Sequence, residues 1–266
     1  MSLFHKTLAS LGLGGARVDT VLETEVLLPG QTLPIQIHVK GGKVDQSVHH
    51  VHLYLCCRYE DEVPVSRGDS ERRLEKVHKT FTLAQWHLPE AFTIGAGEQR
   101  QFECRFELPS NTPITIGDSG VWLETHLDVP LVLDPKDKDP LTIRPDPLLD
   151  GVFTALEQSG FRILQVECEA AAGFALPFVQ VFEFVPVDGP FHGRWRELEL
   201  ITQIEGDELK LWFSIDRRQR GVSGMLASLI GSHELKRELT IPLTLPPSEA
   251  GERVVAYLAQ VDDPSD

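Results

Sequence analysis

Alternation of apolar and polar residues with a period of two is the feature of this sequence that most constrains its fold. Such alternation predicts strands with one buried and one solvated face, because successive side chains of a strand point to opposite sides of the sheet. Strands at this spacing without helices between them predict an antiparallel β-sandwich. In the first half of the chain, the predicted inward positions are Leu33, Ile35, Ile37 and Val39; Val51, Leu53, Leu55, Cys57 and Tyr59; Phe102, Cys104, Phe106 and Leu108; and Val121, Leu123, Thr125, Leu127, Val129 and Leu131.

The second half of the chain repeats the alternating pattern and predicts a second sandwich. The predicted strands cover residues 161–167, 179–185, 196–204, 208–215, 239–243 and 253–261. Within 208–215, Leu211 and Phe213 face inward, whereas Trp212 faces outward and is expected to be exposed. Short helices are predicted over residues 148–158 and 221–231, each followed or ended by glycine. We therefore expect a mainly β protein with two sandwich domains and a few short helices.

A proline-rich stretch, Asp134–Gly151, separates the two halves. Its prolines, at positions 135, 140, 145 and 147, fix φ and remove backbone donors, so this stretch is not expected to form the interior of a strand or helix. A short edge strand over residues 141–143 is the one exception that we allow. The stretch predicts a joint between an N-terminal domain, residues 1–138, and a C-terminal domain, residues 139–266.

Charge and cysteine usage limit the classes of partner. The net charge of −15 opposes binding to phosphate backbones and anionic lipid, so nucleic acid is not an expected partner. Four cysteines without CxxC spacing favour a reduced, cytoplasmic setting. A short apolar helix pattern within residues 3–11 is interpreted as a cap on the end of a sandwich, and a weak membrane or partner anchor is the alternative.

Histidines on two predicted strands are the candidate metal ligands. His50 and His52 project from one face of a strand, about 6.6–7 Å apart. If the preceding hairpin is centred on Val44, His38 lies across from His50. Three imidazoles could hold Zn²⁺ or Cu²⁺. The alternative is three solvated histidines on an outer sheet face, because the sequence places no cysteine, aspartate or glutamate to complete the site.

No motif of a hydrolase or nucleotide-binding enzyme is present. The chain has neither a GxSxG sequence nor a phosphate-binding loop. Asp134, Asp137 and Asp139 are spaced like calcium ligands, but Lys136 and Lys138 between them favour a solvated linker. We therefore expect a protein that is not an enzyme and that uses no cofactor.

The densest basic cluster in this acidic chain is the candidate contact for protein partners. It contains Arg217, Arg218 and Arg220, and an apolar helical face with Met225 follows directly. Arginine, methionine and the neighbouring Trp212 are residue types enriched at interfaces. The alternative is structural, with the arginines paired to acids at the junction between strand and helix.

Several segments, taken in order, resemble the bacterial sporulation-control proteins of the stage-zero M type. The matching segments are Val18–Thr20 (VDT), Gly41–Gln46 (GGKVDQ), Val121–Val129 (VWLETHLDV), the acidic run 134–139 (DPKDKD), Phe178–Pro186 (FVQVFEFVP) and Leu211–Leu226 (LWFSIDRRQRGVSGML). The resemblance implies two arrestin-like sandwich domains and a cytoplasmic, non-enzymatic regulator that acts through protein partners.

Two other functions remain open at this point. One is a peripheral envelope protein that docks through its N-terminal helix and residues 217–231, with weak membrane association. The other is a metal-binding or hydrolytic protein built on a β-scaffold.

Overall fold

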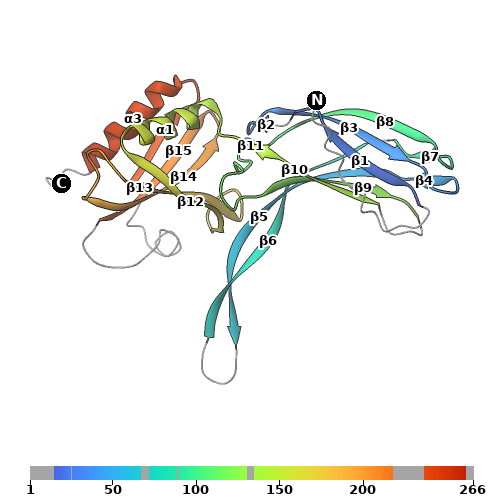
Figure 1. Cartoon of the computed structure of the whole chain (residues 1–266), viewed down its shortest axis with the longest axis horizontal. Coiled ribbons are helices and arrows are strands. Elements are labelled where there is room, and N and C mark those ends of the chain that lie inside the picture. Colours follow the sequence, from blue (N-terminus) through green and yellow to red (C-terminus); the bar gives the residue numbers. More distant parts are fainter. Residues whose placement is uncertain are drawn as a thin grey trace. The chain divides into compact units, whose positions relative to one another are not determined.

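The computed structural model describes residues 15–24, 26–66, 72–88, 90–130, 135–217 and 237–261. The described chain is mainly β, with two helices, α1 and α3, which confirms the expected fold class (Figure 1). The elements are β1 (Arg17–Leu22), β2 (Val26–Leu27), β3 (Thr32–Lys40), β4 (Gln46–Val48), β5 (His50–Ser66), β6 (Arg72–Leu88), β7 (Phe92–Ile94), β8 (Gln99–Glu107), β9 (Val121–Asp128), β10 (Lys136–Pro140), β11 (Thr142–Ile143), α1 (Pro147–Gln158), β12 (Phe161–Ala170), β13 (Phe178–Pro186), β14 (Trp195–Glu205), β15 (Glu208–Arg217), β16 (Arg237–Pro242) and α3 (Pro247–Val261).

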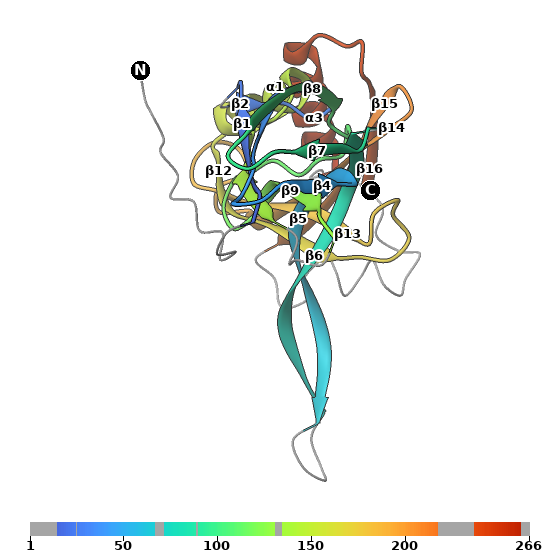
Figure 2. The same cartoon turned by 90° about the vertical axis from the view of Figure 1, so that its right-hand side faces the viewer.

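The chain forms two compact units, and each unit is built from three separate stretches of the sequence. Unit 1 contains the described residues up to Cys57, together with 82–109 and 121–142, and unit 2 contains 58–81, 110–120 and the described residues from 143 onward. Strands β5 and β6, of 17 residues each, run side by side as a twisted ribbon, and each contributes one part to either unit (Figures 1 and 2). The expected division into 1–138 and 139–266 does not include the passage of residues 58–81 and 110–120 into unit 2, because the sequence does not reveal how far a hairpin extends.

Unit 1 buries most of the residues that were predicted to face inward, but Phe102, Cys104 and Phe106 on β8 are only half-buried. Strand β3 lies between β1 and β8 in one antiparallel sheet, and β9 lies between β10 and β5 in the other. Leu33, Ile35 and Leu53 are fully buried. Between β1 and β9, the hydroxyl groups of Thr20 and Thr125 are 2.7 Å apart and share a buried hydrogen bond. The inward positions therefore form the core of this unit.

Unit 2 is built around the antiparallel sheet β12-β13-β14-β15-β16. Both helices lie over one face of this sheet (Figure 1), so helices instead of a second sheet cover that face. The rings of Phe153 on α1 and Phe182 on β13 are 5.0 Å apart, and those of Phe213 on β15 and Tyr257 on α3 are 5.6 Å apart. Aromatic pairs of this kind fill the space between helices and sheet.

The two helices cross at a close contact that requires glycine. A Cβ atom added to Gly151 on α1 would lie 2.2 Å from the carbonyl oxygen of Pro247 on α3. A Cβ atom added to Gly251 would lie 2.6 Å from the Cβ atom of Ala155. Neither distance is compatible with van der Waals contact, so the approach of the two backbones depends on both glycines.

The proline-rich joint contains one strand that was not expected from its sequence, β10. Pro140 is the last residue of β10, which pairs with β9, and Pro147 is the first residue of α1. At these ends the missing N–H group interrupts no internal ladder. The side chain of Asp146 caps α1 by accepting hydrogen bonds from the N–H groups of Leu148 and Leu149, at 2.8 and 3.1 Å. The predicted helix over 148–158 is confirmed, as is a short strand within 141–143.

The strand predicted over residues 253–261 is wrong, because this segment belongs to helix α3. Its buried residues are Ala250, Gly251, Val254 and Leu258. This spacing of i, i+1, i+4 and i+8 marks one face of a helix. The predicted strand over 239–243 corresponds to β16, and the predicted helix over 221–231 lies outside the described residues.

Candidate functional site

The face of the unit 2 sheet opposite the helices gathers carboxylates from three neighbouring strands. We call it the glutamate face and define it by Glu167 and Glu169 on β12, Glu183 on β13, and Glu197 and Glu199 on β14. Strand alternation places these side chains opposite Val166, Phe182 and Leu198, which point toward the core.

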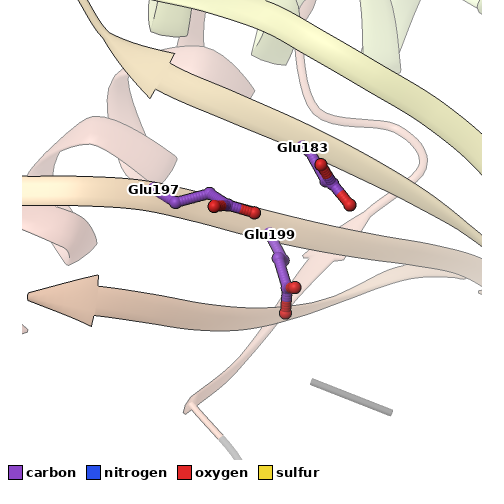
Figure 3. Close-up of side chains that lie close together, drawn as sticks. All are labelled: Glu183, Glu197 and Glu199. Carbon is purple, nitrogen blue, oxygen red and sulfur yellow. The ribbon is translucent and has the colours of Figure 1, made fainter. Parts of the chain in front are cut away.

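Three of these carboxylates converge. Glu183 lies directly across from Glu199 in the β13–β14 pair, and Glu197 is two residues before Glu199 on the same strand. One carboxylate oxygen from each lies within 4.8 Å of the other two (Figure 3). Partial burial and the neighbouring charge of Glu197 raise the pKa of Glu183 above its usual value. Such a set of oxygens suits a hard cation or a cationic side chain.

A lysine from β6 lies at the β12 edge of the glutamate face. Lys76 Nζ lies 3.0 Å from an oxygen of Glu60 and 3.8 Å from an oxygen of Glu167. Burial, followed by the charge of Glu167, raises the pKa of Glu169 to about 7, although Lys76 opposes the shift. The charge of this face therefore changes near neutral pH.

Trp212 is buried on this same face, so the prediction that it is exposed is wrong. It packs with Ala171, Val179, Val181 and Ile201, and only 8% of it is accessible to solvent. The ring of Phe174, from the loop between β12 and β13, meets it edge to face at 5.4 Å. Alternation identified the correct face of β15 but not the residues that cover it.

The predicted partner segment is only partly described. Arg217 is the last residue of β15, and its backbone lies across from Trp195 of β14. Arg218, Arg220 and Met225 lie outside the described residues. A contact through this segment stays a prediction.

The predicted triangle of His38, His50 and His52 does not form. His38 lies on β3 between Asp19 of β1 and Gln101 of β8, whereas β5 pairs with β9 in the other sheet. The segment after Gly41-Gly42 does not return directly along β3, because β4 intervenes and pairs with β7.

Other residues surround His50 and His52 instead. Their rings are 5.4 Å apart, and the ring of His87, from β6, is 6.5 Å from that of His52. In the β5–β9 pair, Asp128 lies directly across from His50 and His126 directly across from His52. The sequence gives no local signal for His87, His126 and Asp128, and only the pairing of distant strands identifies them.

A polar network continues along the same face of β9. Glu124 accepts hydrogen bonds from Trp122 Nε1 at 2.7 Å, and its second oxygen lies 3.2 Å from His126 Nε2. Lys138 Nζ sits 3.7 Å from the centre of the Trp122 ring. Partial burial opposes ionisation, but the two hydrogen bonds and the charge of Lys138 outweigh it and hold the pKa of Glu124 below its usual value. The ionised carboxylate of Glu124 therefore orients the side chains of Trp122 and His126.

The cysteines are free, and three of them have raised pKa values. Burial raises the pKa of Cys168 to about 11, although a contact of 3.7 Å with Ser119 Oγ opposes the shift. Burial also raises the pKa values of Cys56 and Cys104. Nucleophilic thiols require the opposite shift, so these three residues are poor nucleophiles.

Comparison with known proteins identifies the family. The family model described as SpoOM protein (Spo0M) matches residues 4–219. The chain belongs to the Spo0M family. It is 39% identical over 236 residues to the sporulation-control protein Spo0M of Bacillus subtilis strain 168, and the match covers 88% of each chain.

A solved structure supports the same relationship. The crystal structure of Spo0M from Bacillus subtilis has a TM-score of 0.80 to this chain at 34% sequence identity. The match covers 94% of this chain and 98% of the Spo0M chain. The resemblance inferred from the sequence segments is thus confirmed. Neither helix in the described part of the chain is long and apolar enough to cross a membrane.

Proposed function

We propose that this chain is a non-enzymatic regulatory adaptor that acts in the cytoplasm by binding protein partners. The observation that carries the proposal is the family match, in which a sporulation-control protein of Bacillus subtilis is 39% identical over 88% of its length. The raised pKa values of Cys56, Cys104 and Cys168 favour a binding role over thiol chemistry.

The glutamate face is the surface that best fits a partner. Burial, followed by mutual repulsion, makes its carboxylates resist ionisation and raises the pKa values of Glu169 and Glu183. A partner segment that carries arginine or lysine would relieve this repulsion, and arginine could contact two carboxylate oxygens at once. The preferred partner therefore presents a basic surface.

An envelope role has weaker support. The net charge of −15 opposes attraction to anionic lipid headgroups. Docking by the N-terminal segment or by residues 217–231 would have to overcome this repulsion.

The test compares partner recovery from the native cells by matched variants of the full chain. Glu183→Gln, Glu197→Gln and Glu199→Gln are combined in one variant, which removes three charges from the glutamate face. The control combines Glu249→Gln and Glu252→Gln, two exposed positions on α3, on the other side of the same sheet. We expect crosslinked partners to be lost from the first variant and retained by the control, while both variants remain folded by circular dichroism.

Two results would change the proposal. If Arg218→Glu combined with Arg220→Glu abolishes recovery while the glutamate variant does not, the contact lies at the predicted basic segment. If the wild-type chain itself recovers no partner above the level of an unrelated bait, the adaptor function is wrong.

A further inference from the structure

We propose that His50, His52 and His87 bind a zinc ion on the face of the β5–β6 pair. His50 and His52 point to this face from β5, because Val51 and Leu53 between and beside them are buried in the core. His87 comes from the neighbouring strand β6, and its ring lies beside that of His52. The site is separate from the glutamate face and does not depend on the proposed partner binding.

Ring spacing supports a shared ion. With Zn–N distances of about 2.0–2.1 Å and tetrahedral angles, the ring centres of two ligating imidazoles lie roughly 5.2 Å apart. The rings of His50 and His52 are 5.4 Å apart, close to this separation. The rings of His52 and His87 are 6.5 Å apart, so binding requires a closure of about 1 Å.

Side-chain rotation can supply this closure. Among the described residues, only Glu183, Glu197 and Glu199 already bring three ligand atoms within 4.8 Å of one another. The histidine nitrogens must therefore turn toward a common point. His50 and His87 are exposed and can change rotamer at low cost, whereas His52 is partly buried and provides the fixed ligand.

A buried ring nitrogen points to the same site. His52 Nδ1 is buried and has no hydrogen-bond partner within the described part of the chain. An unsatisfied buried polar atom destabilises the folded chain, because it has lost its hydrogen bonds to water. Ligation of zinc through Nδ1 would give this atom a partner and so stabilise the bound state. Ligation through Nε2 would do the same if the Nδ1–H group then donates a hydrogen bond to a neighbour.

One acidic residue lies next to the proposed site. Asp128 lies across from His50 in the strand pair, but its Oδ2 atom is nearest to a histidine outside the site, at 3.9 Å from Nδ1 of His49. A carboxylate at this position can orient a ligating imidazole once its side chain turns from His49 toward His50. Nitrogen ligands favour Zn²⁺ over Ca²⁺ and Mg²⁺, and three histidines leave a fourth position for water.

The test titrates Zn²⁺ into the metal-free full chain, purified without a histidine tag, at pH 7.5 by calorimetry. We expect one strong site, and we expect His52→Ala and His87→Ala each to weaken binding at least tenfold, because even supporting residues of zinc sites contribute 10–100-fold. His38→Ala is the matched control, since His38 is an exposed strand histidine in the other sheet. Co²⁺ should give the intense visible bands of a tetrahedral site in the wild type and in His38→Ala, but not in His52→Ala or His87→Ala.

The proposal is overturned if the wild-type chain shows no strong Zn²⁺ site. Binding that survives both His52→Ala and His87→Ala overturns it as well, as does a loss of affinity in His38→Ala equal to that in His52→Ala. His52→Gln keeps a side chain of similar polarity, so a folded His52→Gln variant that binds Zn²⁺ normally contradicts the proposal even if His52→Ala is unstable.

Discussion

Replacement of Glu169 by glutamine should stabilise the protein at alkaline pH and have little effect at acidic pH. Glu169 lies on β12 and pairs with Glu60 of β5, with Glu167 two residues away on the same strand. Burial, followed by the charge of Glu167, raises its pKa from 4.5 to about 7. Glutamine keeps the shape of the protonated side chain and removes the charge.

The sign follows from proton linkage. Because the pKa is higher in the folded state, protonated Glu169 contributes stability that is fully present below the unfolded pKa and is lost as the pH rises through about 7. The shift corresponds to about 3 kcal/mol at alkaline pH. Since the side chain is partly exposed, solvent screening reduces this to about 1–2 kcal/mol. For a protein of this size, that is a rise in melting temperature of about 2–8 °C.

The assay is a series of thermal melts of both proteins from pH 5 to pH 8.5 at constant ionic strength. The control is Glu252→Gln, an exposed position on α3 beyond the first turn of the helix, which should leave the melting temperature unchanged throughout. Equal stabilisation by Glu169→Gln at both ends of the range, or no gain at pH 8.5, would show that the pKa of Glu169 is not raised in the folded protein.

Two further substitutions test the architecture by chemical denaturation. Leu53→Ala removes a fully buried side chain and should lower the free energy of unfolding by about 2–5 kcal/mol, whereas Tyr54→Ala on the opposite face should cost clearly less; equal losses would show that the outer face is covered. Gly151→Ala would place a Cβ atom 2.2 Å from the Pro247 carbonyl oxygen and should cost about 2 kcal/mol or more; a neutral result would contradict the close helix crossing.

Local patterns predicted the inward residues well but not the helix α3. In β3 and the first part of β5, strict alternation leaves one possible face, and Leu33, Ile35 and Leu53 are buried as expected. In residues 253–261, Val254, Val255 and Leu258 fit a short strand as well as a helix. Packing against α1 through Gly251 favours the helix over the strand. This contact joins segments that are distant in the sequence, so local periodicity cannot predict it.

The candidate sites depend even more on distant pairing. The sequence predicted that His50 and His52 share a face, and their rings are 5.4 Å apart. It could not identify His87 as the third histidine, because the register of a hairpin with 17-residue strands is set by tertiary contacts. The glutamate face was missed for a related reason, since Glu183 and Glu199 meet only once β13 and β14 pair.

Binding of protein partners can be tested without any substitution by mapping crosslinks in the native cells, lysine by lysine. Lys76 contacts Glu60 and Glu167 beside the glutamate face, and Lys210 lies on β15 with its side chain on the same face as Trp212. Lys40 and Lys43 belong to unit 1 and serve as references. We predict that crosslinks to other proteins concentrate at Lys76 and Lys210. A wild-type chain that yields only crosslinks within itself, at a coverage that includes these lysines, would contradict the account of a regulator that works through protein partners.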